Sequence, residues 1–300
     1  MKTGFIGLGA MGAPMAVNLH KAGQLHAAWN RTQATAAAIA SASGLALAAG
    51  PGPLAQECDL IITSVSDDAA LLEVVDALVP GLGAGKVMVD TSTVSSTTAR
   101  EAAARLASVG AVFLDAPVLG GVEGARQGKL AMMVGGDAAV LERARTVLSA
   151  VASKITHIGP VGSGQGVKAV NQLMMAGINQ AVAESLAFGQ AMGLPMDKVI
   201  DVLGAGAASN WFLAHRGASM LNHEFVPGFK VALHHKDLSI CKHMAESLAA
   251  QLPLVEMTLV HYKRLMEAGL GDADISALFH QKKSLFGDDY SAQPVPIPPV

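Results

Sequence analysis

The chain has 300 residues, of which 51% are hydrophobic and 15% charged, and its formal net charge is −3. The length predicts about two folded domains, and the composition excludes a mainly disordered chain. The lack of a basic block argues against nucleic acid as a partner. The lack of an apolar run of about 18 residues argues against a membrane span. The two cysteines, Cys58 and Cys241, are too few for a disulfide framework, so we expect a reduced, cytoplasmic protein.

The chain begins with a strand, a glycine-rich turn and a helix. The strand is expected at residues 3–6, a Gly-x-Gly-x-x-Gly turn follows at 7–12, and the helix runs from about 11 to 22. Gly7 forms the tight turn, Gly9 lets the backbone approach a pyrophosphate, and Gly12 lets the helix pack on the strand. The helix N-terminus favours the anion, so this pattern predicts dinucleotide binding, with a purely structural turn as the alternative. The expected cofactor contacts in the turn are Gly7, Leu8, Gly9, Ala10, Met11 and Gly12.

A second predicted strand, at 25–29, ends in Asn30, Arg31 and Thr32. Asn30 follows Gly12 by 18 residues, close to the spacing of about 20 at which a residue reads the ribose of a dinucleotide. An acidic residue here would accept a hydrogen bond from the 2′-hydroxyl of NAD, and this sequence has none. The neutral amide, the guanidinium and the hydroxyl suit the 2′-phosphate of NADP instead. The alternative is a solvated Arg31 beside a helix N-cap at Thr32, although Thr32 could do both.

Strands and helices continue to alternate up to residue 157. The expected elements are a helix at 32–42, a strand near 45–48, a turn at 51–53, a strand at 60–64, a helix to 78, a strand at 86–90, a helix to 108, a strand at 111–116, a helix at 137–148 and a strand at 154–157. This alternation predicts a parallel sheet with right-handed crossovers, in which ligands bind beyond the carboxyl ends of the strands. The loops at those ends are 7–12, 30–32, 64–68, 91–93 and 116–121.

Two adjacent glycines, Gly120 and Gly121, follow the strand expected at 111–116. Glycines at a strand end can present backbone N–H groups to an anion such as a substrate carboxylate. A flexible hairpin is the alternative interpretation.

Strand patterns stop after residue 162, where glycines and a proline mark a domain boundary. Helices are expected at 163–192, 195–203, 210–220, 237–250, 253–268 and 274–284. We therefore predict an α/β Rossmann-type domain with a parallel sheet at 1–161, an all-helical domain at 162–292 and a proline-rich tail at 293–300.

The helix expected at 163–192 carries Lys168 in apolar surroundings. Residues three, four and eleven positions further on are Asn171, Gln172 and Asn179, so three amides share the helix face of Lys168. A lysine and amides need partners when they are buried, which favours a functional site on this face. A lysine that extends from the helix end into solvent is the alternative.

Four segments of the chain resemble the β-hydroxyacid dehydrogenases. This family includes 3-hydroxyisobutyrate dehydrogenase, tartronate semialdehyde reductase and the glyoxylate/succinic semialdehyde reductases. The four segments are GFIGLGAMGAPMAVNL at 4–19, DAPVLGG at 115–121, GQGVKAVNQ at 164–172 and KDL at 236–238, with a weaker fifth match at 269–277. Together they cover essentially the whole chain.

The resemblance implies a role for each matching residue. Lys168 is the implied catalytic general acid/base, and Lys236 is implied to close over cofactor and substrate. The residues implied to line the nicotinamide side are Val65, Ser66 and Thr93. The implied substrate contacts lie at Leu119, Gly120, Gly121, Asn171 and Gln172. Residues 30–32 and 64–71 are more similar to the NADPH-using glyoxylate and semialdehyde reductases than to the NAD-using members.

Two positions depart from the family pattern. The family usually has serine where Leu119 stands, and that serine helps to hold the substrate carboxylate. It usually has asparagine where Gln172 stands, and glutamine presents its amide one methylene further out. These departures leave the catalytic lysine in place but affect which substrate is expected.

The chemistry of hydride transfer agrees with the implied role of Lys168. Burial lowers the pKa of a lysine, and an ammonium stabilises the oxyanion that develops on a carbonyl as hydride arrives. We therefore expect an NADP(H)-dependent oxidoreductase of small hydroxy acids or aldehyde acids. The alternatives are a reductase of imines or bulkier ketones, which the apolar Leu119 suggests, and a non-catalytic dinucleotide-binding module. The pair His234 and His235 has no third ligand at a suitable spacing, so we expect a structural role and no metal.

The residues from Leu173 to Met192 carry one formal charge, on Glu184. A helix that is apolar around most of its circumference must be buried on several sides. A second copy of the chain would cover such a helix through a symmetric interface, and the resemblance implies the same. We therefore expect a homodimer or homotetramer that buries at least ~1,000 Å² per interface.

Overall fold

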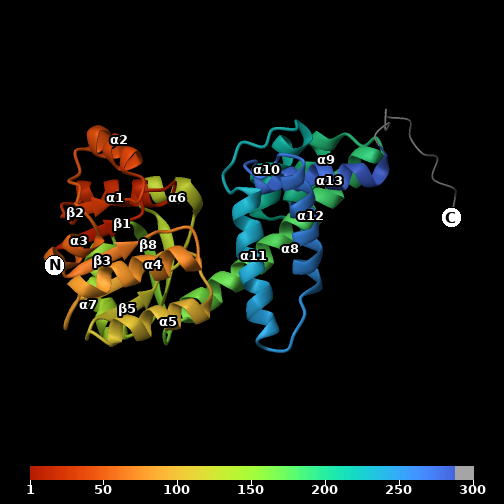
Figure 1. Cartoon of the computed structure of the whole chain (residues 1–300). Coiled ribbons are helices and arrows are strands. Elements are labelled where there is room, and N and C mark those ends of the chain that lie inside the picture. Colours follow the sequence, from red (N-terminus) through yellow and green to blue (C-terminus); the bar gives the residue numbers. More distant parts are fainter. Residues whose placement is uncertain (288–300) are drawn as a thin grey trace. The chain divides into compact units, whose positions relative to one another are not determined.

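The computed structural model describes residues 1–287 (Figure 1). The contacts within the chain form two compact units. The first unit runs from Met1 to Ala169 and the second begins at Val170. The division falls within one helix, α8 (Ser163–Ala191). The expected proline-rich tail at 293–300 lies outside the described residues.

The first unit contains an eight-stranded sheet in the order β2-β1-β3-β4-β5-β7-β6, with β8 paired to β7. Its strands are β1 (Thr3–Ile6), β2 (Ala27–Trp29), β3 (Leu60–Thr63), β4 (Val87–Asp90), β5 (Val112–Asp115), β6 (Val118–Leu119), β7 (Leu130–Gly135) and β8 (Ala152–Gly159). Strands β1 to β5 are parallel, as predicted, and β1, β3 and β4 are buried along their whole length because helices cover both faces.

Parallel pairs dominate the sheet, as predicted, and the exception is β7, which is antiparallel to β5 and β6. The chain returns beside the end of β5 through β6 and the short helix α6 (Gly121–Gln127), and antiparallel neighbours need only such a local connection. Of the expected anion-binding pair, Gly120 directly follows β6 and Gly121 is the first residue of α6.

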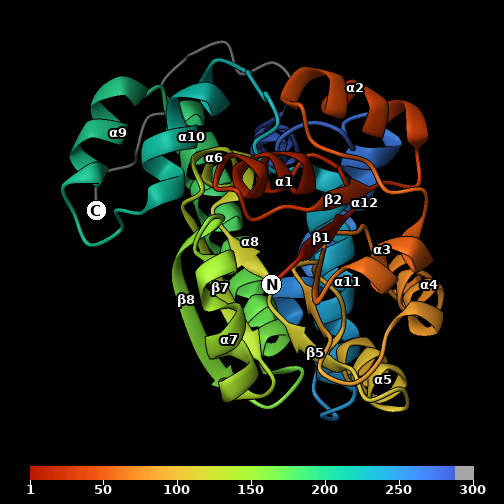
Figure 2. The same cartoon turned by 90° about the vertical axis from the view of Figure 1, so that its left-hand side faces the viewer.

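Helices cover the two faces of the sheet in separate groups (Figure 2). The helices are α1 (Gly12–Lys21), α2 (Gln33–Ser43), α3 (Pro51–Glu57), α4 (Asp68–Leu78), α5 (Ser96–Ala107), α6 and α7 (Ala138–Leu148). One core joins Phe5 and Ile62 to α1, α6 and α7, and the other joins Ile61 and Met88 to α3, α4 and α5. Side-chain N-caps at Asp67, Ser95 and Asp137 begin α4, α5 and α7.

Two local expectations in the first unit are wrong. The strand expected near 45–48 is only an isolated bridge between Ala28 and Leu47, because Gly44 ends α2 in a left-handed conformation and α3 begins soon afterwards. The turn expected at 51–53 is the first turn of α3. Proline is favoured there because its fixed φ suits a helix start and its missing N–H is not needed.

The second unit is helical, as expected. After α8 come α9 (Met196–Gly204), α10 (Trp211–Leu221), α11 (Val231–Glu246), α12 (Pro253–Glu267) and α13 (Leu278–Lys283), the last flanked by short 3₁₀ turns at Ile275–Ala277 and Ser284–Phe286. The expected start of α11 at residue 237 is wrong, since the helix begins six residues earlier at Val231. Lys230 at its N-cap makes no side-chain capping bond, so no capping residue marks this start. No helix within residues 1–287 is long and apolar enough to cross a membrane.

Candidate active site

The glycine turn between β1 and α1 leaves room for a dinucleotide backbone. Gly7 has a φ of +95°, and a side chain there would collide with the carbonyl oxygen of Ser64. A Cβ at Gly9 would meet nothing within 4 Å, so the backbone is open to a ligand at that point. The first turn of α1 carries no acidic residue and no side-chain cap. These features fit a pyrophosphate, because the helix N-terminus can offer N–H groups and a positive dipole to it.

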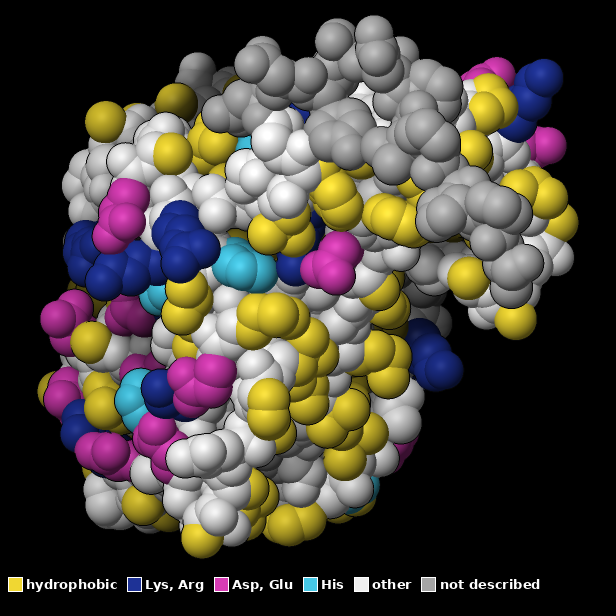
Figure 3. All heavy atoms as spheres, turned by 90° about the vertical axis from the view of Figure 1, so that its right-hand side faces the viewer, with side chains coloured by type: hydrophobic (Ala, Val, Ile, Leu, Met, Phe, Trp, Pro, Cys, Tyr) yellow, Lys and Arg dark blue, Asp and Glu magenta, His cyan; other side chains and the backbone are white. Residues whose placement is uncertain are grey.

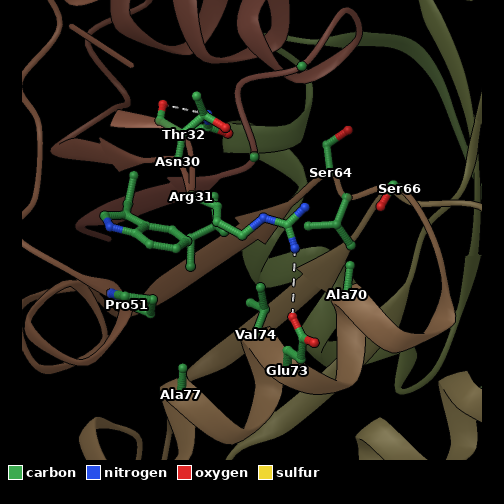
Figure 4. A pocket seen from close by; sticks show the side chains of 15 residues that line it. Asn30, Arg31, Thr32, Pro51, Ser64, Ser66, Ala70, Glu73, Val74 and Ala77 are labelled. Atoms are coloured by element: carbon green, nitrogen blue, oxygen red, sulfur yellow. Dashed lines mark hydrogen bonds and ion pairs between the residues drawn. The ribbon is translucent and has the colours of Figure 1, made fainter. Parts of the chain in front are cut away.

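A cavity of about 390 Å³ opens beside this turn at the carboxyl ends of β1, β2 and β3 (Figure 4). Seven of the predicted cofactor residues line it, namely Gly7, Gly9, Asn30, Arg31, Thr32, Val65 and Ser66. The Arg31 guanidinium crosses the cavity toward Glu73 of α4, with 3.8 Å between Arg31 Nη1 and Glu73 Oε2. Both side chains are exposed, at 79% and 70%, so the pair is solvent-screened and weak.

The side chain of Asn30 forms a hydrogen bond to the backbone of the glycine turn. Its Oδ1 accepts a hydrogen bond from the Leu8 N–H at 2.9 Å, and its Nδ2 donates to the Thr32 carbonyl at 3.0 Å. Leu8 itself is buried in the core, with its side chain 1% exposed. The amide of Asn30 thus fixes the shape of the loop, and Arg31 is the cation available to a phosphate in this cavity.

The loops after β3 and β4, which carry Val65 and Thr93, are tied together by a buried hydroxyl. The Val65 N–H donates to Ser92 Oγ at 2.8 Å, and Ser92 Oγ donates to Asp90 Oδ1 at 2.6 Å. Thr63 Oγ1 donates to the same Asp90 oxygen at 2.7 Å. The residues implied to line the nicotinamide side therefore stand on loops fixed at the strand ends.

Asp90 is a fully buried carboxyl at the end of β4. Its Oδ2 has no hydrogen-bond partner among residues 1–287. Burial raises the pKa of Asp90 to about 6, against the opposing effect of the Ser92 and Thr63 hydrogen bonds. The nearby carboxyl of Asp115, which pairs in register with Asp90 across β4 and β5, raises it further.

Asp115, at the end of β5, caps the helix that carries Lys168. The Gly162 N–H donates to its Oδ1 at 2.7 Å and the Gln165 N–H to its Oδ2 at 2.9 Å. A helix leaves its first N–H groups without partners, and here a carboxylate from a neighbouring strand accepts from them. Burial still raises the pKa of Asp115 above its ordinary value.

Lys168 lies in the second turn of α8, where its Nζ donates to the Val118 carbonyl at 3.1 Å. Val118 is in β6, immediately before Leu119 and the pair Gly120 and Gly121. Gly120 has a φ of +123° and Gly121 a φ of +60°. The first unit thus brings the candidate lysine together with the glycine loop implied to bind substrate.

The second unit holds the remaining predicted residues in a polar chain of its own. Asn171 Nδ2 donates to Gln172 Oε1 at 2.8 Å, and Gln172 Nε2 donates to Asp237 Oδ2 at 2.6 Å. Asp237 Oδ1 forms an ion pair with Lys236 Nζ at 2.9 Å. Gln172 and Asp237 are both buried, so this chain links α8 to α11 inside the helical unit.

The sequence interpretation did not name seven residues of these networks as site residues: Thr63, Glu73, Asp90, Ser92, Asp115, Gln165 and Asp237. Asp115 and Gln165 lie within the matched segments. The sequence feature that could have identified them is a charged or amide side chain among apolar neighbours. Glu73 gave no signal, because an acidic residue on an exposed helix face is ordinary. His234 is buried between the Tyr262 hydroxyl and the Gln172 carbonyl, at 3.0 and 3.2 Å from its ring nitrogens, so it packs within the helical unit.

Comparison with known proteins connects these features to a family. A family model described as the NAD binding domain of 6-phosphogluconate dehydrogenase matches residues 2–159. A second, described as NAD-binding of NADP-dependent 3-hydroxyisobutyrate dehydrogenase, matches residues 162–281. Together they account for both units of the chain.

Two curated relatives and one solved structure are similar over most of their length. The probable 3-hydroxyisobutyrate dehydrogenase of Mycobacterium tuberculosis (strain H37Rv) is 36% identical over 284 residues, covering 92% of this chain and 96% of that protein. The 2-hydroxy-3-oxopropionate reductase of Escherichia coli (strain K12) is 38% identical over 257 residues, covering 84% and 87%. The structure of Mycobacterium tuberculosis 3-hydroxyisobutyrate dehydrogenase with L-serine has a TM-score of 0.86 at 34% identity, covering 93% and 98%. The chain therefore belongs to the β-hydroxyacid dehydrogenase family and is a hydroxyacid dehydrogenase that binds a nicotinamide dinucleotide.

Proposed function

We propose that the protein transfers hydride between NADP(H) and a small hydroxy acid or aldehyde acid, with Lys168 as the proton donor and acceptor. The observation that carries the proposal is the position of Lys168, which stands near the carboxyl ends of the strands, on a helix capped by Asp115 and beside the glycine loop at 119–121. When bound, the nicotinamide supplies or accepts the hydride.

Lys168 supports reduction in two ways. Its ammonium group polarises the substrate carbonyl, and it gives a proton to the oxygen as negative charge develops there. In oxidation the neutral amine takes that proton back. The Val118 carbonyl, at 3.1 Å, fixes the direction of the Nζ group without neutralising its charge.

We propose NADP(H) rather than NAD(H) because Arg31 is the cation that lines the cavity beside the glycine turn, while Asn30 stands where an acidic residue would read the ribose of NAD. We further propose that Val65, Ser66 and Thr93 line the nicotinamide, and that Lys236 closes over cofactor and substrate. In this arrangement Gly120, Gly121, Asn171 and Gln172 hold the substrate.

Leu119 bears on the identity of the substrate. An apolar side chain at this position cannot donate a hydrogen bond to a substrate carboxylate, which leaves that task to backbone N–H groups and amides.

Initial rates with glyoxylate, succinic semialdehyde, other small semialdehydes and cyclic imines, each with NADPH and NADH, test the proposal. We expect the highest kcat/KM with an aldehyde acid and NADPH. A higher value with the cyclic imines would instead favour the imine reductase alternative.

We also propose that two or four copies assemble through the helical unit, and that the protein works in the cytoplasm with both cysteines reduced. Large apolar side chains on α8 are exposed, Val170 by 61%, Met174 by 62% and Phe188 by 53%. Apolar side chains gather on the face that Figure 3 shows, and both apolar and polar side chains line a groove between α8 and α12. We expect light scattering at micromolar concentration to give a multiple of the monomer mass of 30.6 kDa; the monomer mass would contradict this assembly.

A further inference from the structure

Gln165 lies one helical turn before Lys168 in α8, and its side chain is 1% exposed. Its Nε2 donates to the Ser92 carbonyl at 2.8 Å, and its Oε1 accepts from the Val94 N–H at 3.3 Å. The two backbone groups that it binds belong to the residues on either side of Thr93. One amide side chain therefore holds the backbone on both sides of a residue proposed to line the nicotinamide.

The backbone of Gln165 is held as firmly as its side chain. Its N–H donates to Asp115 Oδ2 at 2.9 Å, and the adjacent Gly164 lies so close that a Cβ there would stand 2.9 Å from the same oxygen. Three residues further along α8, Lys168 donates to Val118, which itself follows Asp115 by three residues. The anchored first turn of α8 therefore fixes the backbone position from which the Lys168 side chain extends, relative to β5 and β6.

Ser92 extends this network to a second loop. Its carbonyl receives the Gln165 amide, while its hydroxyl accepts from the Val65 N–H and donates to Asp90. The proton donor on α8 and the loops proposed to hold the nicotinamide are thus joined through one buried side chain, Gln165, by hydrogen bonds within the first unit.

We propose that Gln165 is a positioning residue that sets the distance between the Lys168 amine and the loop carrying Thr93. In reduction the hydride goes to the carbonyl carbon and the lysine proton to the carbonyl oxygen, so the two donors must be aligned with one small group. Misplacement by about 1 Å can cost on the order of a hundredfold in rate. The inference rests on the proposed role of Lys168, which its test examines separately.

The test is a single-turnover measurement with Gln165→Met, which keeps the volume and loses both hydrogen bonds. Enzyme with bound NADPH is mixed with the faster of glyoxylate and succinic semialdehyde, and the loss of NADPH absorbance is followed. The amplitude of the absorbance change is proportional to the number of folded, competent sites, and the rate constant is that of hydride transfer. We expect the rate constant to fall about ten- to a hundredfold, with the Kd for NADPH nearly unchanged.

Gln180→Met is the matched control. Gln180 is another buried amide of α8, but its Nε2 donates to Thr258 Oγ1 at 3.0 Å inside the helical unit. We expect this variant to lose stability and keep the wild-type rate constant. Gln165→Asn is a second test variant that keeps the amide but is one methylene too short to reach both partners, so it should also be slow and is less disturbing to folding.

The outcomes separate the two proposals. If Lys168→Ala transfers hydride at the wild-type rate, the proposed role of the lysine is wrong. If Lys168→Ala is inactive while Gln165→Met or Gln165→Asn keeps the wild-type rate constant at any amplitude, Gln165 has only a structural role and the inference is overturned. A loss of rate in the Gln180→Met control equal to that in the Gln165 variants would overturn it as well.

Discussion

The loop after β2 and the ends of β4 and β5 use polar side chains in opposite ways. At the first, Arg31 and Glu73 form a long ion pair in solvent, with side chains 79% and 70% exposed. At the second, Asp90, Asp115 and Gln165 are buried and joined to backbone groups by hydrogen bonds. The exposed pair can rearrange around a ligand at little cost. The buried groups hold one geometry, because breaking one of their hydrogen bonds leaves a further buried polar group unsatisfied.

This difference predicts two classes of mutational effect. Changes at the exposed loop should alter which cofactor binds and leave the rate of the chemical step alone. Changes at the buried strand ends should alter the chemical step or the stability and leave cofactor choice alone.

Lys168→Ala should lower kcat by roughly 10²–10⁴-fold, the usual contribution of a general acid–base group. The Kd for NADPH, measured by fluorescence titration, should remain near the wild-type value, because the proposed contact of Lys168 is with the substrate carbonyl. A variant with near-normal kcat would show that another group delivers the proton.

Arg31→Ala should lower kcat/KM with NADPH by about ten- to a hundredfold, because a charge-assisted contact to phosphate contributes roughly 1.5–3 kcal/mol. The value with NADH should change little. Initial rates at varied cofactor concentration measure both. Equal losses with the two cofactors would mean that Arg31 does not read the 2′-phosphate.

Asp90→Asn should change how stability depends on pH. Since the folded pKa of Asp90, about 6, is above its ordinary value of 3.8, the protonated carboxyl favours the folded state below pH 4 and that contribution is lost as the pH rises through 6. Asparagine cannot ionise, so the variant should gain stability relative to wild type between pH 4 and 7, on the order of 1–3 kcal/mol. Urea unfolding at several pH values measures the difference; parallel curves would show that Asp90 does not titrate in this range.

Glu73→Gln should have the smallest effect, and in the opposite direction from Arg31→Ala. Removing the carboxylate frees the guanidinium and removes a negative charge that faces the proposed phosphate site. Because both side chains are exposed, we expect the Kd for NADPH to fall by no more than about fivefold and the Kd for NADH to stay the same. Weaker binding of NADPH to this variant would show that Glu73 helps to hold Arg31 in place for the phosphate.

The sequence predicted the parts of the molecule in which a local pattern determines the structure. The glycine turn, the first five strands and the helical second half follow from periodicity and glycine spacing, and the structure confirms them. The reversal at β7 could not be predicted, because pairing of 115 with 135 depends on how a short connection folds back and not on the composition of either strand. The first six residues of α11 were missed because no capping side chain marks the start of the helix.

For the candidate site, the sequence predicted individual residues, and their roles stay predictions. Lys168, Gly120 and Gly121 were predicted from the segments that resemble the family. Seven predicted cofactor residues line the cavity beside the glycine turn. The partners of these residues were not predictable. Gln165 bonds to residues 71 and 73 positions away in the chain, and Asp115 to residues 47 and 50 positions away. Only the fold brings such groups together.

The most direct test of the central proposal is transfer of deuterium from cofactor to product. The wild-type chain is incubated with NADPH carrying deuterium at C4 of the nicotinamide, using both stereoisomers separately, and with the aldehyde acid that turns over fastest. We predict that mass spectrometry finds the hydroxy acid product labelled at its carbinol carbon with one of the two stereoisomers, and that Lys168→Ala forms this product at least ~100-fold more slowly. A product that is unlabelled with both stereoisomers, or equal rates of labelling by the two proteins, would contradict the assignment of hydride transfer with Lys168 as its proton donor.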